Sequence, residues 1–100
     1  MAYTLAIAGL GAIGLRVARA VDAGAVPRIR LSAVSAKDLS RARARVAELT
    51  SPPAVVPLKE LAEHADIIVE CVPAAAFREV AEAAVARGRW FLPLSVGALI

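Results

Sequence analysis

The chain alternates between two patterns of apolar and polar residues. Short apolar runs, typical of strands buried in a parallel sheet, are separated by longer segments in which apolar residues recur every three or four positions, as on one face of a helix. The runs predict strands at residues 3–8, 29–34, 54–56, 67–72 and 90–94. The periodic segments predict helices at residues 12–23, 39–49, 58–64 and 73–88.

Each of the longer predicted helices has an apolar face that we expect to be buried. In the first helix, Ile13, Val17 and Val21 recur every four residues. The faces of the second and last helices comprise Leu39, Ala42, Val46 and Leu49, and Phe77, Val80, Ala81, Ala84 and Val85. Trp90 and Phe91 are expected to anchor the last strand in the core.

Strands that alternate with helices predict an α/β fold with a parallel sheet covered on both faces. Right-handed crossovers then favour the doubly wound Rossmann topology, with strand order 3-2-1-4-5. A length of 100 residues suits a single domain, 1–100. Because residues 95–100 are wholly uncharged, we expect the chain to be cut before a second domain.

Composition narrows the class of protein. The residues are 59% hydrophobic and 21% charged, as in a globular protein, and the net charge is +3. The basic residues are spread along the chain and lack interleaved aromatic residues, so we expect no nucleic-acid partner. The single cysteine, Cys71, cannot form an internal disulfide, which favours a reducing cytoplasm. No apolar stretch is long enough to span a membrane, no positive residue precedes the first apolar run as in a secretory signal, and no metal-ligand spacing occurs.

Three glycines, Gly9, Gly11 and Gly14, match the G-x-G-x-x-G pattern between the first predicted strand and the first predicted helix. In a dinucleotide-binding domain the first glycine permits a tight turn, the second lets a pyrophosphate approach the backbone, and the third lets the helix lie against the strand. The free N–H groups of Ala12 and Ile13 would then face the phosphates. The alternative is a glycine-rich turn that binds no dinucleotide.

The end of the second predicted strand bears on the choice of dinucleotide. An NAD site usually has an acidic residue there for the ribose hydroxyls, but this chain has Ser35, followed by Lys37. Serine, Lys37 and the nearby Arg41 suit a 2′-phosphate, so we expect NADP, or use of both NADP and NAD. The alternative is that Ser35 and Asp38 only cap the following helix and that the two cations are solvated.

The end of the fourth predicted strand should lie beside the nicotinamide half of the cofactor. Cys71 is expected to line this pocket or to lie in the core, and a nucleophilic role is disfavoured because the only histidine, His64, is at the far end of the strand. Val72 and Pro73 would form the loop against the nicotinamide ribose. Glu70 lies within an apolar strand, near the cofactor or facing a partner domain, and has no firm assignment.

Three segments together resemble the amino-terminal domain of L-aspartate dehydrogenases: Gly9-Leu-Gly-Ala-Ile-Gly14, Ala65-Asp-Ile-Ile-Val-Glu-Cys71 and Leu94-Ser-Val-Gly-Ala-Leu99. The resemblance covers essentially the whole chain and adds Ser95 to the expected cofactor site. It implies NAD(P)-dependent oxidation of L-aspartate to iminoaspartate, a reaction that feeds NAD biosynthesis. It also implies that the catalytic residues and the site for the small amino-acid substrate lie in a later domain, so no catalytic residue is assigned.

Other classes of function remain open from the sequence. The chain is also compatible with the cofactor domain of a homoserine or sugar dehydrogenase, and with a nucleotide sensor without catalysis. A methyltransferase is disfavoured because Ser35 stands where that class places an acidic residue. Assembly into a homo-oligomer is left undecided.

Overall fold

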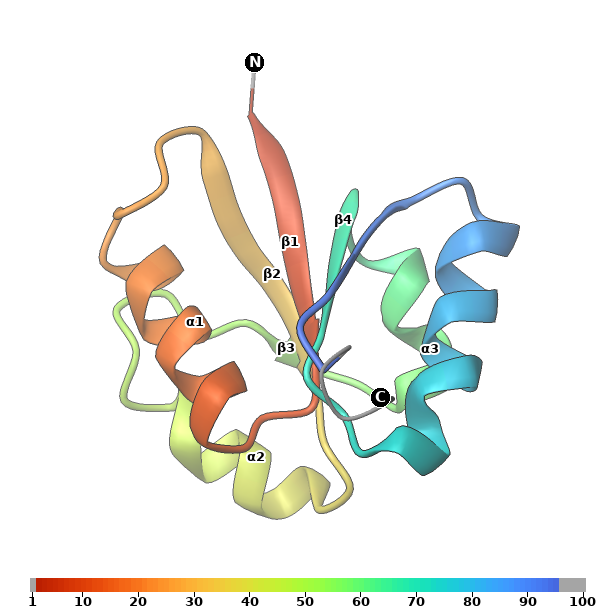
Figure 1. Cartoon of the computed structure of the whole chain (residues 1–100). Helices are drawn as coiled ribbons and strands as arrows, with labels where there is room; N and C mark the ends of the chain where they lie inside the picture. Colours follow the sequence, from red (N-terminus) through yellow and green to blue (C-terminus); the bar gives the residue numbers. More distant parts are fainter. Residues whose placement is uncertain (1, 96–100) are drawn as a thin grey trace.

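A computed structural model describes residues 2–95 and shows a parallel sheet flanked by helices (Figure 1). The five strands lie in the order β3-β2-β1-β4-β5, which confirms the predicted doubly wound topology. The strands are β1 (Tyr3–Ala8), β2 (Ile29–Ser35), β3 (Ala54–Val55), β4 (Ile67–Glu70) and β5 (Trp90–Pro93). The helices are α1 (Ala12–Asp22), α2 (Leu39–Val46), the 3₁₀-helix η1 (Leu58–Glu63) and α3 (Ala74–Ala86).

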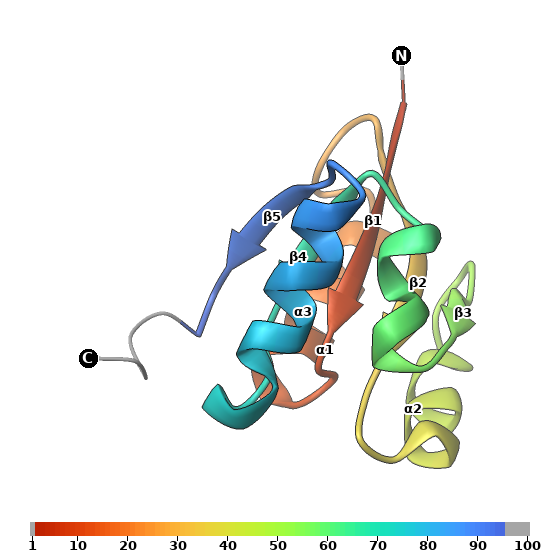
Figure 2. The same ribbon diagram turned by 90° about the vertical axis from the view of Figure 1, so that its right-hand side faces the viewer.

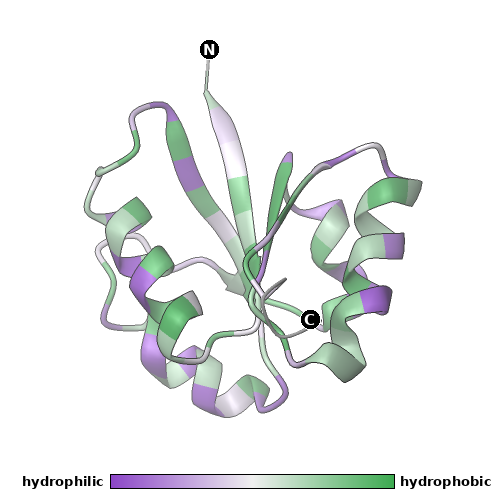
Figure 3. Ribbon diagram, viewed as in Figure 1, coloured by the Kyte–Doolittle hydropathy of each residue, from purple (hydrophilic) through white to green (hydrophobic). Residues whose placement is uncertain are grey.

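Alternation along β1 divides the core into two layers (Figure 2). Leu5 and Ile7 pack with α1 and α2 on one face of the sheet, whereas Ala6 and Ala8 pack with η1 and α3 on the other. Successive side chains of a strand point to opposite faces, so an unbroken apolar run can fill both layers. Figure 3 shows this run as green along the carboxyl-terminal part of β1 and along β4.

Three residues that the sequence predicted to be buried are instead exposed: Ile13 (59%), Val85 (72%) and Trp90 (71%). Val85 follows Ala84, the residue of α3 that faces the sheet, and one residue along a helix turns the side chain through about 100°. Trp90 alternates with Phe91 on the edge strand β5. Phe91 packs edge-on against Phe77 with ring centroids 5.7 Å apart, so Trp90 points to the opposite face.

The boundaries of the elements also differ from the predicted ones. β4 ends at Glu70, so Cys71 and Val72 belong to the following loop, and α2 ends at Val46. Pro73 is the residue that precedes α3, close to its predicted start. Among residues 2–95, no helix has the length and apolar character that a membrane crossing requires.

Asp66 ties the start of β4 to the start of β1. Its Oδ2 accepts hydrogen bonds from the Thr4 N–H at 2.9 Å and from the Thr4 hydroxyl at 3.1 Å. The bond from the Thr4 N–H is the main reason that the pKa of Asp66 lies below its ordinary value of 3.8. A carboxylate whose pKa is lowered by folding stabilises the folded protein above the unfolded pKa, and this stabilisation is lost as the pH falls through the folded pKa.

We therefore expect Asp66→Asn to make the free energy of unfolding depend less on pH at acid pH. Between about pH 5 and about pH 3, the wild-type protein should lose more free energy of unfolding than the variant, because only the wild type has this carboxylate to protonate. Urea denaturation at each pH measures both curves, and Asp22, which also has a lowered pKa, is common to both proteins. Parallel losses in the two proteins would contradict this role for Asp66.

Candidate functional site

The carboxyl ends of β1, β2 and β4 meet at one edge of the sheet, where the chain order reverses between β1 and β4. In open α/β sheets this reversal leaves a crevice in which ligands bind. A cleft of about 960 Å³ lies there. Its walls comprise the glycine loop, the segment after β2, one side of α2 and the start of α3, contributed by Gly9, Leu10, Gly11, Ala36, Lys37, Asp38, Arg41, Ala42, Arg45, Leu58, Cys71, Val72, Pro73, Ala75 and Ala76.

Two glycines of the loop are required by the fold itself. Gly9 has φ +94°, and a Cβ there would lie 2.5 Å from the main-chain oxygen of Cys71. A Cβ on Gly14 would collide with the main-chain oxygen of Gly9. The predicted tight turn at Gly9 and the close approach of α1 at Gly14 are therefore both present.

Gly11 differs from its two neighbours because the fold does not require a glycine there. Its φ is −83°, and a Cβ at this position would meet none of the described residues within 4 Å. Gly11 precedes α1, whose first turn has no side-chain cap and no acidic residue. The first N–H groups of a helix have no acceptor within it, so those of Ala12 and Ile13 face outward beside a residue without a side chain.

A second, smaller hollow of about 250 Å³ lies on the other side of the glycine loop. It is lined by Gly11, Ala12, Ile13, Gly14, Cys71, Leu94 and Ser95. Ile13 is exposed because it lies in the first turn of α1, where it forms a wall of this hollow. The predicted residues of the loop and Ser95 are thus brought together here.

Hydrogen bonds from distant segments hold the glycine loop in place. The Gly9 N–H donates to the Ser35 carbonyl at 2.8 Å, and the Cys71 N–H donates to the Ala8 carbonyl at 2.7 Å. Arg45 of α2 reaches back to the loop, where its Nη1 donates to the Leu10 carbonyl at 2.7 Å. No local pattern of the sequence indicates this contact, because it joins residues 35 positions apart.

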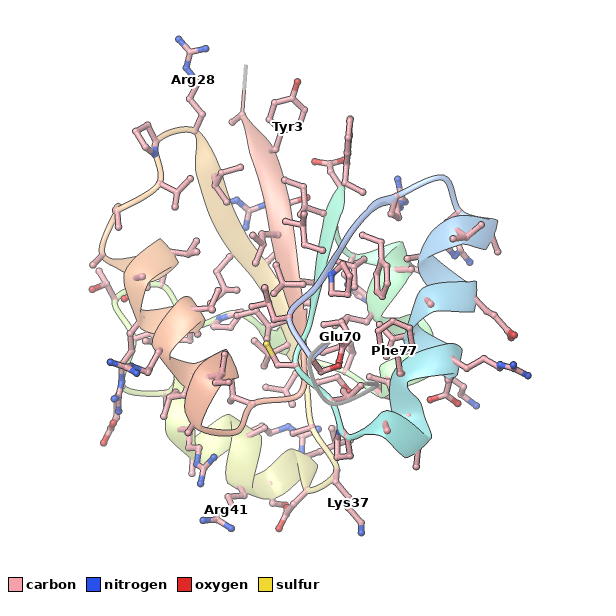
Figure 4. All side chains as sticks on the ribbon, viewed as in Figure 1. Tyr3, Arg28, Lys37, Arg41, Glu70 and Phe77 are labelled. Atoms are coloured by element: carbon pink, nitrogen blue, oxygen red, sulfur yellow. The ribbon has the colours of Figure 1, made fainter. Side chains whose placement is uncertain are left out.

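Ser35 does not have the predicted role. It is 1% exposed, and its hydroxyl is buried without a hydrogen-bond partner among the described residues. Its side chain therefore does not reach the cleft to contact a 2′-phosphate. It does not cap α2 either, because Asp38 accepts the Arg41 N–H at 3.0 Å. Lys37 and Arg41 line the cleft and extend from its rim (Figure 4).

On the other side of the site, Cys71 lines both hollows, whereas Val72 and Pro73 line only the larger cleft. Burial, and secondly the charge of Glu70, raise the pKa of the Cys71 thiol above its ordinary value of 9.0. The thiol is therefore protonated at neutral pH, which agrees with a residue of the pocket wall and not with a nucleophile. Within residues 2–95, no group of three or more His, Cys, Asp and Glu side chains could hold a metal ion.

Glu70, which the sequence left unassigned, is fully buried at the end of β4, on the side of the sheet that faces α3 (Figure 4). Its Oε2 accepts hydrogen bonds from the Val72 N–H at 2.8 Å and from the Ser95 hydroxyl at 2.5 Å. Its Oε1 accepts one from the Ser95 N–H at 3.3 Å. Glu70 therefore joins the loop after β4 to the segment after β5; the remainder of the Leu94–Leu99 motif, residues 96–99, lies outside the described residues.

Comparison with known sequences identifies relatives of this chain. Residues 9–100 match the model of the family described as "Homoserine dehydrogenase, NAD binding domain". L-aspartate dehydrogenase 3 of Bordetella bronchiseptica is 46% identical over 96 residues, which is 96% of this chain and 35% of the relative. L-aspartate dehydrogenase of Methanocella arvoryzae is 44% identical over 97 residues, 97% of this chain and 36% of the relative. The chain thus spans about a third of the length of these relatives, and the predicted resemblance to L-aspartate dehydrogenases is confirmed.

Solved structures share the fold at lower identity. Myo-inositol dehydrogenase of Lactobacillus casei, in complex with NAD(H) and myo-inositol, superposes with a TM-score of 0.82 at 17% identity, covering 93% of this chain and 28% of its own. UDP-N-acetylglucosamine 3-dehydrogenase of Acidithiobacillus ferrooxidans has a TM-score of 0.76 at 24% identity, covering 93% of this chain and 29% of its own. These similarities confirm the Rossmann fold.

The contrast between Gly11 and Gly14 generates a prediction. Gly11→Val should leave the free energy of unfolding nearly unchanged, because its side chain enters open space, yet weaken NADH binding at least about tenfold by filling the approach to the helix amides. Gly14→Ala should instead lower the stability itself, since its Cβ meets the backbone of Gly9. Calorimetric titration and urea denaturation of both variants measure the two effects. Unchanged NADH affinity in a folded Gly11→Val protein would disprove the placement of the pyrophosphate.

Proposed function

Because the chain belongs to the homoserine dehydrogenase NAD-binding domain family, we propose that it is the cofactor domain of a dehydrogenase that oxidises L-aspartate to iminoaspartate. The cofactor is NAD or NADP. Two curated L-aspartate dehydrogenases that are 44–46% identical over nearly the whole chain support this choice of substrate. The product would feed NAD biosynthesis, in the cytoplasm.

The main observation behind the proposal is that the fold does not require a glycine at position 11. Gly9 and Gly14 are explained by backbone contacts, but nothing in the described structure occupies the space that a side chain at Gly11 would enter. The first turn of α1 has no side-chain cap, and Gly11, Ala12 and Ile13 line the smaller hollow beside it. A pyrophosphate fits both features, because it needs close access to main-chain N–H groups and gains from the positive end of the helix dipole.

We propose that the two halves of the dinucleotide bind on either side of the glycine loop. The larger cleft, which begins at the end of β2, suits the adenosine, and the smaller hollow between the glycine loop and β5 suits the nicotinamide. A bound nicotinamide would supply the hydride acceptor for oxidation of the substrate amine to the imine, a reaction that also releases a proton. The chain itself would bind and orient the cofactor, and Arg45 holds the loop carbonyl of Leu10 by a hydrogen bond.

A second candidate is oxidation of homoserine, which the description of the matching family favours. We place the substrate site of either reaction in a later domain, so the residues of this chain do not distinguish the two candidates. Assay of the complete protein separates the two.

We expect the complete protein to reduce NAD or NADP in the presence of L-aspartate. Formation of reduced cofactor is followed by absorbance, with D-aspartate, L-homoserine and myo-inositol as comparison substrates. Turnover of homoserine in preference to L-aspartate would replace the first candidate by the second. Cofactor binding without turnover of any of the four would favour a nucleotide sensor.

The rim of the cleft favours a cofactor with a 2′-phosphate. Lys37 and Arg41 line it, and Asp38, the acidic residue nearest the end of β2, accepts the N–H of Arg41 as the cap of α2. Oδ1 of that carboxylate is engaged by the backbone, and the cations Lys37 and Arg41 would offset its repulsion of a 2′-phosphate. We propose a preference for NADP.

Arg41→Ala should therefore weaken NADPH binding about tenfold, because a hydrogen bond between charged groups contributes about 1.5 kcal/mol or more. NADH affinity should change little. Arg43→Ala is the matched control, since Arg43 is an exposed arginine of the same helix that does not line the cleft. Equal effects of the two substitutions on NADPH, measured by calorimetry, would refute the assignment of Arg41.

A further inference from the structure

We propose that Ser95 accepts a hydrogen bond from the carboxamide N–H of the nicotinamide, and that Glu70 is the positioning residue that makes it an acceptor. This inference rests on the proposed function, because it takes the smaller hollow as the nicotinamide site. It assigns a role to a fully buried carboxylate that the binding of the phosphates does not use.

The burial of Glu70 is the first step of the argument. An ionised carboxylate without solvent contact costs several kcal/mol unless hydrogen-bond donors surround it. Here the donors are the N–H groups of Val72 and Ser95 and the hydroxyl of Ser95. The hydroxyl bond is the shortest of them, at 2.5 Å, as expected when a hydroxyl donates to a charged oxygen.

The second step concerns the single proton of the serine hydroxyl. A hydroxyl has one hydrogen to donate and two lone pairs that accept. The Val72 N–H and the Ser95 hydroxyl both donate to Oε2 of Glu70, so the Ser95 proton points to Glu70 and the lone pairs of the hydroxyl are left for other partners. Ser95 also lines the smaller hollow, opposite the start of α1. We place the lone pairs of this hydroxyl at the β5 side of the hollow.

The third step matches this acceptor to a ligand group. Beyond the pyrophosphate, in the half of the cofactor away from Lys37 and Arg41, the nicotinamide carries a primary amide with two N–H donors. The same ring with a carboxylate would bring negative charge against the lone pairs, and with a methyl ketone it would offer no donor. Ser95 thus selects the amide form of the cofactor.

The test compares four ligands by calorimetric titration of the complete protein: NAD, nicotinic acid adenine dinucleotide, 3-acetylpyridine adenine dinucleotide and ADP-ribose. Wild type should bind NAD about fivefold more tightly than the acetylpyridine analogue, and disfavour the carboxylate analogue more strongly. In Ser95→Ala the preference for NAD over the acetylpyridine analogue should fall to about one, whereas Ser95→Thr, which retains a hydroxyl, should keep it.

ADP-ribose, which lacks the ring, separates this inference from the proposed function. Its affinity should be the same in wild type and Ser95→Ala, because a purely structural effect would weaken all four ligands together. If wild type binds none of the ligands, the proposed function fails. If ADP-ribose and NAD bind but Ser95→Ala keeps the wild-type preference for NAD over both analogues, the inference is overturned and the function stands.

The role of Glu70 has its own readout. Glu70→Leu removes the acceptor and frees the Ser95 proton, which can then be donated to a ligand carboxylate. The preference for NAD over nicotinic acid adenine dinucleotide should fall in this variant, because its affinity for the carboxylate analogue rises. A general loss of binding would instead lower that affinity. The comparison with Ser95→Ala decides the inference without this variant, because that protein keeps the bonds from the Val72 and Ser95 N–H groups to Glu70.

Discussion

The cofactor site depends on the main-chain N–H groups at the start of α1, which no side chain among the described residues caps. A capping side chain there would stabilise the helix by about 1 kcal/mol. The chain provides such a cap for α2, where Asp38 accepts the N–H of Arg41, but not for α1, where Gly11 stands in that position. Without a capping side chain, α1 is less stable, but its first N–H groups stay accessible to an anion. The glycine loop around them keeps the same space open.

A second constraint joins the segments after β4 and β5, which border the nicotinamide hollow on the side away from the glycine loop. Parallel strands end at the same edge of a sheet, but their loops have no backbone ladder to fix them relative to one another. Glu70 supplies this connection from within the core, through the loop after β4 and the segment after β5. The phosphate end of the site is therefore set by local backbone geometry, and the nicotinamide end is set by a buried charge.

The sequence predicted what depends on local pattern. Strand order, the helix starts and the glycine loop follow from periodicity and spacing, and the structure places all three as expected. It did not predict contacts between distant residues: Arg45 reaches Leu10 across 35 positions, and Glu70 reaches Ser95 across 25. The burial of Ser35 and the exposure of Trp90 were missed because each depends on which face of its strand is covered, and a fully apolar run gives no signal of that.

The most direct measurement of the central claim is the amide NMR spectrum of the protein during titration with NADPH. The account predicts that the N–H signals of Ala12 and Ile13 shift strongly and saturate together with binding, as expected for amides that gain a phosphate acceptor. Tight binding that leaves both signals in place, with the large shifts elsewhere in the chain, would contradict it.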